Sequence, residues 1–249
     1  MSTPNNPTQR HALVTGANKG IGLAVAEGLL SLGMTVFLGA RDTSRGTAAV
    51  AALVARGFDA RFVRLDVTDH TSLDAAADVI ARDVRELDIL VNNAGILVTP
   101  IRLPSETSVD EIRATYETNV FGVVAVTNAM LPLLRRSSAA RIVNLTSDLG
   151  SLTLASTDEN FPQLLAYNSS KTALNAITVT YANELRSEGI LVNAVSPGSV
   201  ATDQNGHAGV LTTEQGARLP IRMATLASGG PTGTAVTADN DLNHQLLAW

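Results

Sequence analysis

The sequence has no cysteine among its 249 residues, which excludes a thiol nucleophile, a disulfide framework and a cysteine-ligated metal site. The four histidines, His11, His70, His207 and His244, lie far apart, so they form no closely spaced metal motif. Aromatic residues make up 4% and charged residues 16% of the chain, while apolar residues make up 45%. This composition is typical of a compact globular domain and excludes a disordered chain.

Positive charge and long hydrophobic runs are also scarce. The net charge is -5, and Arg135 and Arg136 form the longest basic run, so we expect neither nucleic acid nor an anionic membrane as a partner. The most apolar stretch, 120–134, contains Pro132 and is too short to span a bilayer. Residues 1–10 are polar and lack the apolar segment of a signal peptide, so we predict a disordered leader and a cytoplasmic location.

The chain does have a regular alternation of short β-branched or apolar runs with longer segments of helical period. Such alternation indicates βαβ units. The predicted strands are 11–15, 35–39, 60–65, 88–92, 141–146, 191–195 and 232–236, and the predicted helices are about 20–32, 44–56, 69–86, 108–135, 165–188 and 213–227. The pattern predicts one α/β domain over 11–249, with a doubly wound, seven-stranded parallel sheet flanked by helices.

Two stretches lack either period and follow predicted strands. Residues 149–163 and 197–211 are rich in Ser, Thr, Asn, Asp and Gly. Because ligands of such sheets bind outside the carboxyl ends of the strands, we predict substrate loops at about 148–164 and 197–212.

A glycine-rich turn follows the first predicted strand and opens the first helix, with the sequence Gly16-Ala17-Asn18-Lys19-Gly20-Ile21-Gly22. Gly16 would permit the sharp turn, Gly20 would let a pyrophosphate approach the backbone, and Gly22 would let helix and strand pack closely. The free amides of the helix N-terminus would bind the phosphates. In this position the turn predicts a dinucleotide site.

The end of the second strand bears on the choice of nicotinamide. An NAD site needs an acid there for the ribose 2′-hydroxyl, whereas this strand ends Leu38-Gly39-Ala40-Arg41. Arg41 and Lys19 could bind a 2′-phosphate, which predicts NADP(H). The alternative interpretation is two solvated surface cations.

Tyr167 and Lys171 form the clearest chemical motif. A spacing of four places both side chains on one helix face. A cation near a phenol lowers its pKa, so Lys171 would adapt Tyr167 for proton transfer to and from an alcohol oxygen. Ser147, after the strand at 141–146, would hold the carbonyl oxygen, although a turn serine is an equal alternative from its sequence alone.

Together these motifs resemble the classical short-chain dehydrogenase/reductases, and among them the NADPH-dependent carbonyl reductases. The resemblance covers nearly the whole chain and also includes Asn92-Asn93-Ala94-Gly95 and Pro197-Gly198. It implies a Rossmann fold, a homodimer or homotetramer, and Asn119 as a fourth catalytic residue that holds a water linked to Lys171. It also implies that Lys171 binds the nicotinamide ribose. The further cofactor contacts that it implies are Asp66 and Val67 at the adenine, Asn93, Ala94 and Gly95 at the ribose and central sheet, and Pro197, Gly198, Val200 and Thr202 at the nicotinamide.

The chain departs from the family pattern in two places. Ser147 and Tyr167 are 20 residues apart, where the family usually has about a dozen, and the extra length falls in the first substrate loop. The tail 239–249 carries Leu242, Leu246, Leu247 and Trp249, so we expect it to pack on its own subunit or on a neighbour.

The sequence therefore predicts an NADP(H)-dependent reductase of a small, partly apolar ketone or aldehyde, with Leu97, Leu149, Leu152 and Phe161 beside Ser147 as candidate pocket residues. One alternative is an epimerase or dehydratase that uses the same Tyr-Lys pair, although such relatives carry a larger substrate domain. The other is a redox sensor that binds NADP(H) without catalysis, which would not need all four catalytic candidates.

Overall fold

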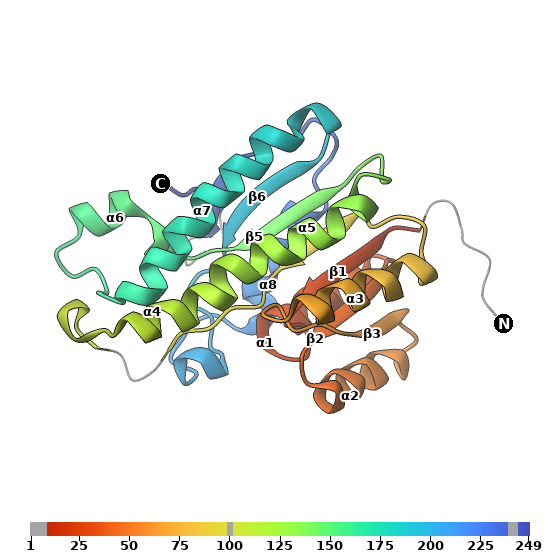
Figure 1. The fold of residues 1–249 in the computed structure, drawn as a ribbon, viewed down its shortest axis with the longest axis horizontal. Coiled ribbons are helices and arrows are strands. Elements are labelled where there is room, and N and C mark those ends of the chain that lie inside the picture. Colours follow the sequence, from red (N-terminus) through yellow and green to blue (C-terminus); the bar gives the residue numbers. More distant parts are fainter. Residues whose placement is uncertain (1–8, 99–101, 239–243) are drawn as a thin grey trace.

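A single sheet with the strand order β3-β2-β1-β4-β5-β6-β7-β8 forms the centre of the protein (Figure 1). The computed structural model describes residues 9–98, 102–238 and 244–249, and the backbone alone for His244. The strands are β1 (His11–Thr15), β2 (Thr35–Ala40), β3 (Ala60–Arg64), β4 (Ile89–Asn92), β5 (Arg141–Leu145), β6 (Leu191–Ser196), β7 (Ala235–Ala238) and β8 (His244–Leu246).

The first seven strands run parallel, which confirms the predicted doubly wound sheet, and β8 pairs antiparallel with β7. The eighth strand was not predicted. Its three residues are too few to show a strand pattern, and they become a strand because β7 offers a free edge. The predicted start at 232 was also too early, since β7 begins at Ala235.

Helices cover both faces of the sheet. They are α1 (Gly20–Ser31), α2 (Thr43–Val54), α3 (His70–Asp83), α4 (Val109–Tyr116), α5 (Gly122–Leu134), α6 (Leu152–Thr157), α7 (Leu165–Leu185) and α8 (Thr213–Ala224). Successive residues of β1 show why two layers form: Ala12 and Val14 pack with α1 and α8, while Leu13 packs with α3 and α5. Every residue of β1 is buried, as expected for a strand covered on both faces.

The helix predicted at 108–135 is continuous but not regular. A π-helical turn (Glu117–Phe121) joins α4 to α5. The joined helix, Val109–Leu134, has the length and hydropathy of a membrane span. The prediction that the most apolar stretch is too short to span a bilayer considered only residues 120–134, which are part of this helix. In this structure the helix packs on the sheet through residues such as Val126, Met130 and Leu134, as core helices of globular proteins do.

The first predicted substrate loop contains a helix that its sequence did not indicate. The Ser151 hydroxyl caps α6 by accepting a hydrogen bond from Leu154 N. The Trp249 carbonyl accepts hydrogen bonds from Thr153 N at 2.9 Å and Thr153 Oγ1 at 2.6 Å. The helix therefore depends on a contact between segments that are 96 residues apart.

Both chain ends as described are attached to the domain. Gln9 donates a hydrogen bond to Thr35 Oγ1, so the predicted leader is wrong for residues 9 and 10, and residues 1–8 lie outside the described part. Leu247 is 5% exposed and packs against Ala194 and Ala235. The tail thus packs on its own chain, as one of the two expected arrangements, whereas Leu242 lies outside the described residues.

Adjacent leucines allow a matched test of the tail. We expect Leu247→Ala to lower the free energy of unfolding by about 2 kcal/mol or more, because it removes a buried side chain. Leu246 is 73% exposed, so Leu246→Ala should change it by less than about 0.5 kcal/mol. Urea denaturation would measure both, and equal stability of the two variants would contradict the packing of the tail.

Candidate functional site

The predicted site residues follow the carboxyl ends of neighbouring parallel strands, and the sheet brings them to one edge. The glycine-rich turn follows β1, Arg41 follows β2, Asp66 follows β3, Gly95 follows β4 and Ser147 follows β5. A crevice at this edge, where strand order reverses between β1 and β4, is the usual ligand position in such sheets.

Asn93 holds the glycine-rich turn against the sheet. Its Nδ2 donates hydrogen bonds to Thr15 O at 2.8 Å and Gly16 O at 3.2 Å. The Thr15 hydroxyl accepts hydrogen bonds from the backbone N–H groups of Asn93 and Ala94. Asn93 and Ala94 therefore lie at the central sheet, as the family resemblance implied.

The three glycines have different steric roles. Gly16 and Gly20 have φ values of 64° and 59°, which favour glycine. A Cβ at Gly22 would lie 2.4 Å from Asn93 Nδ2, so Gly22 is needed for close packing. At Gly20 the nearest atom to an added Cβ would be Thr202 Cγ2 at 3.9 Å, which leaves space above the backbone.

The N-terminus of α1 is open to an anion. Lys19 is the N-cap, its side chain caps no N–H group, and the first turn contains no acid. Asn18 is half-buried beside it, and Ile21 packs against the core. Unfilled backbone donors next to the space at Gly20 fit the pyrophosphate of a dinucleotide.

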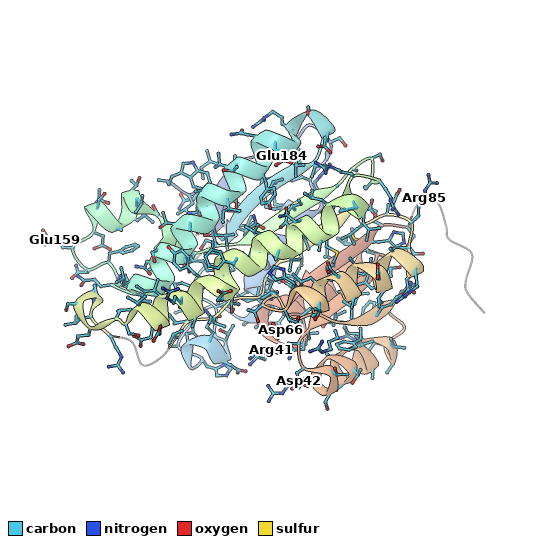
Figure 2. All side chains as sticks on the ribbon, viewed as in Figure 1. Arg41, Asp42, Asp66, Arg85, Glu159 and Glu184 are labelled. Carbon is cyan, nitrogen blue, oxygen red and sulfur yellow. The ribbon has the colours of Figure 1, made fainter. Side chains whose placement is uncertain are left out.

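Arg41 and Asp66 lie on the same rim of the sheet, where Leu65 N donates a hydrogen bond to Ala40 O (Figure 2). Arg41 is exposed and makes no hydrogen bond or ion pair with any residue that the structure describes. Asp66 Oδ1 accepts hydrogen bonds from the N–H and hydroxyl of Thr68, and Val67 packs against Gly122. Arg41 is thus available to an anionic ligand.

Lys19 has a partner that its sequence position did not indicate. Its Nζ lies 2.6 Å from Asp203 Oδ2, in the second predicted substrate loop. Lys19 and Arg41 were predicted to act together on one phosphate. Of these two cations, Arg41 alone has no hydrogen bond or ion pair with the residues that the structure describes.

Lys171 lies almost fully inside the protein, with 5% of the residue exposed. Its Nζ donates a hydrogen bond to Leu145 O at 2.8 Å and lies 5.5 Å from the centre of the Tyr167 ring. Burial lowers the pKa of Lys171 to about 8. A Cβ added at Gly95 would lie 3.6 Å from this Nζ, so the turn after β4 faces the ammonium.

Ser147 lies near the Tyr167 phenol, close enough for its side chain to lower the pKa of that phenol. The expected direction of the Tyr167 pKa shift is wrong for this structure, since burial of the phenol raises its pKa. The polar side chains of Ser147 and Gln204 lower the pKa of Tyr167 and only partly offset that effect. The ammonium of Lys171 bonds to Leu145 O and lies 5.5 Å from the ring centre, so the favourable effect of its charge on the phenolate is smaller than the cost of desolvation.

Asn119 occupies the middle of the π-helical turn, and only 1% of the residue is exposed. Its amide accepts a hydrogen bond from Ile96 N at 2.8 Å and donates to Ile96 O at 2.9 Å and to Ser170 Oγ at 3.1 Å. The side chain therefore joins the turn after β4 to α7. These protein partners occupy both Nδ2 hydrogens, so any water held by Asn119 would have to bind at Oδ1.

Two residues that our sequence analysis did not select help to form the site. Gly150 touches α7, because an added Cβ would lie 2.8 Å from the Cβ of Lys171. Ser170 accepts the Asn119 hydrogen bond and donates to Tyr167 O. The position of Ser170 between Tyr167 and Lys171 was a usable signal, whereas the close approach of Gly150 has none in the sequence.

A cleft beside Tyr167 is lined mainly by apolar side chains. It includes Leu97, as predicted, and also Val98, Leu164 and Leu165, with Arg102 and Glu111 at its polar wall. The other candidates, Ser147, Leu149, Leu152 and Phe161, do not line this cleft. Leu152 is 63% exposed on α6, the helix whose Thr153 donates hydrogen bonds to Trp249 O.

The segment after β6 reaches the same edge. Gly198 has a φ of 79°, and Val200 forms an isolated β-bridge with Leu211. Thr202 lies beside Gly20 and caps a short 3-10 helix (Asp203–Asn205). Of the residues predicted at the nicotinamide, Thr202 thus lies beside the glycine-rich turn, whereas Val200 is 4% exposed and packs against Leu211 and Gly216.

Known proteins share both the sequence pattern and the fold. A family model described as short chain dehydrogenase matches residues 10–209. Short-chain dehydrogenase/reductase 1 of Saponaria officinalis is 37% identical over 92% of this chain and 94% of its own length.

Two solved structures show the likeness in three dimensions. An NADPH-bound carbonyl reductase from chicken fatty liver has a TM-score of 0.84 and 28% identity, covering 97% of this chain and 99% of its own. A 3-oxoacyl-[acyl-carrier protein] reductase with bound NAD from Brucella melitensis has a TM-score of 0.80 and 26% identity, covering 92% of this chain and 88% of its own. By its sequence and its fold, this chain belongs to the short-chain dehydrogenase family of oxidoreductases.

Proposed function

We propose that this protein is an NADP(H)-dependent oxidoreductase that reversibly reduces a small ketone or aldehyde to an alcohol. The observation that carries the proposal is the meeting of the Tyr167 phenol, the Ser147 hydroxyl and the buried Lys171 ammonium beside an apolar cleft. A proton donor, a hydrogen-bond donor for a carbonyl oxygen and a nearby positive charge are what alkoxide formation requires.

Each side chain has a distinct part in this chemistry. When bound, the nicotinamide supplies or accepts the hydride. Ser147 donates a hydrogen bond to the carbonyl oxygen, and Tyr167 gives its phenolic proton to the alkoxide. Lys171 stabilises the resulting phenolate electrostatically and is available to the ribose hydroxyls. Asn119 holds the turn after β4 and, through Ser170, the start of α7 in place.

The raised pKa of Tyr167 suits the reductive direction. Burial keeps the phenol protonated at neutral pH, so it is ready to donate. Oxidation of an alcohol instead needs the phenolate, which the same burial disfavours.

The choice of NADP(H) rests on the end of β2. Alanine stands at the position where an acid would bind a ribose 2′-hydroxyl, and the next residue, Arg41, is exposed without a partner among the described residues. A planar guanidinium matches phosphate geometry. The NADPH bound to the chicken carbonyl reductase supports this choice, while the NAD in the Brucella enzyme makes it one to test.

The cleft supports a substrate with an apolar body. Leu97, Val98, Leu164 and Leu165 offer hydrocarbon surface next to Tyr167. A ketone or aldehyde on an aliphatic or aromatic frame would bury that surface while its oxygen reaches the phenol. Ketones, aldehydes, keto esters and diketones form the first substrate panel, with NADPH and NADH followed separately by their absorbance.

Replacing Tyr167 tests the proton donor. We expect Tyr167→Phe to reduce kcat by about 10²- to 10⁴-fold, because it removes the phenolic proton while keeping the ring. Tyr181→Phe is the matched control, since Tyr181 lies on the same helix and bonds to Asn128. Equal turnover by both variants and the unchanged protein would exclude Tyr167 as the donor.

Replacing Arg41 tests the cofactor. We expect Arg41→Ala to weaken NADPH binding about tenfold or more and to leave NADH binding nearly unchanged, because only NADPH carries the 2′-phosphate. Arg45→Ala is the matched control, because it removes a cation of the same rim and this cation already pairs with Asp42. Nucleotide fluorescence titrations would give the affinities, and an unaltered NADPH to NADH ratio in Arg41→Ala would refute the assignment.

The pH dependence tests the part of Lys171. Its lowered pKa means that the ammonium is charged below about pH 8 and neutral above it. Carbonyl reduction should therefore stay level up to that pH and decline above it, as stabilisation of the phenolate is lost. The Lys171→Arg variant stays charged, so its slower reaction should lack this decline, and the same decline in both proteins would assign it to another group.

A further inference from the structure

The second predicted substrate loop lies over the glycine-rich turn and contacts it directly. Asp203 Oδ2 is 2.6 Å from Lys19 Nζ, between segments 184 residues apart. The Thr202 methyl is the atom nearest to the space above Gly20. The contact therefore spans the opening through which a nucleotide would reach the N-terminus of α1.

The geometry of this loop presents the Asp203 carboxylate to Lys19. Thr202 and Asn205 form a reciprocal capping box around the 3-10 helix that begins at Asp203. The other carboxylate oxygen, Oδ1, lies 3.0 Å from His207 Nε2. His207 has a φ of 62°, a left-handed conformation that costs free energy in a residue other than glycine. The residue whose ring contacts Asp203, His207, thus has an unfavourable backbone conformation.

The carboxylate occupies the donor that a nucleotide phosphate would need. Lys19 has a single ammonium, and in this conformation Asp203 holds it at hydrogen-bond distance. Both side chains of the pair are more than half exposed, 56% for Lys19 and 59% for Asp203. The ion pair is therefore weak enough to be displaced by a doubly charged group. A nucleotide without a 2′-phosphate lacks the doubly charged group at the ribose that would compete with Asp203 there.

We propose that Asp203 is a cofactor-specificity residue, whose carboxylate substitutes for a 2′-phosphate on Lys19 and must give way when a 2′-phosphorylated nucleotide binds. This inference rests on the proposed use of NADP(H) and adds a residue that opposes it. Arg41 and Lys19 favour the phosphorylated cofactor, and Asp203 reduces that preference by competition. The preference of the protein for NADPH over NADH is the balance of these two opposing effects.

The same turn also reaches the catalytic end of the site. Gln204, next to Asp203, lies close enough to the Tyr167 phenol to lower its pKa. The ion pair with Lys19 and this approach to Tyr167 therefore belong to one loop conformation. A variant of Gln204 changes this loop without changing its charge, and this makes it a useful control.

Nucleotide fragments without a nicotinamide isolate the adenosine end of the site. We would titrate adenosine 2′,5′-bisphosphate and adenosine 5′-monophosphate by calorimetry into the unchanged protein and three variants. Asp203→Asn should bind the bisphosphate about two- to fivefold more tightly and leave the monophosphate nearly unchanged, because only the bisphosphate has a 2′-phosphate that competes with Asp203 for Lys19.

Two matched variants separate competition from other effects. Asp42→Asn removes the same charge from the same rim, where Asp42 pairs with Arg45 and not with Lys19. Gln204→Ala alters the same turn and keeps Asp203. Both should leave the ratio of the two affinities within about twofold of the unchanged protein.

Each result bears on the proposal. A rise in the ratio in Asp203→Asn alone supports it. An unchanged ratio in Asp203→Asn overturns it, and so does an equal rise in Asp42→Asn or Gln204→Ala. In either case the cofactor assignment still stands if the wild-type protein prefers the bisphosphate to the monophosphate. If the wild-type protein lacks that preference, the NADP(H) assignment and this inference are overturned together.

Discussion

Lys171 carries a charge into the interior of the protein, and the elements around it are arranged to satisfy that charge. A buried ammonium is costly unless it is hydrogen-bonded, and Lys171 meets this need at Leu145 O, at the end of β5. To reach that carbonyl, α7 must lie close to the segment after β5, which the absence of a side chain at Gly150 permits. Because Tyr167 precedes Lys171 by one helical turn, the same contact places the phenol beside Ser147.

A second set of contacts holds the turns around this ammonium in register. Asn119 bonds to the backbone of Ile96 and to Ser170, so it joins the turn after β4 to α7. Asn93 joins the same turn to the glycine-rich turn after β1. The nucleotide end and the catalytic end of the site are thus linked by two side-chain amides, and loss of either amide would leave backbone groups without these partners.

The local sequence was sufficient to predict a strand or helix wherever a pattern of apolar residues repeats along one segment. The strands of the parallel sheet are apolar runs buried on both faces, and β1 begins and ends as predicted. Helices α1, α3 and α7 begin within one residue of their predicted starts. The patterns failed where a partner distant in sequence decides the structure. The strand β8 forms on the edge of β7, α6 is held by Trp249, and the π-helical turn accommodates Asn119. Leu149, Leu152 and Phe161 were placed at the pocket from loop position alone, which does not fix where a side chain points.

The sequence by itself determined the order of strands and helices, the glycine-rich turn and the spacing of Tyr167 and Lys171, because each depends on residues a few positions apart. Tertiary structure alone decided that Asp203 pairs with Lys19, and that the Tyr167 pKa is raised although a cation is near. Both outcomes depend on how far apart distant segments finally lie and on how much water remains around each group. Neither quantity is encoded in the spacing of residues along the chain.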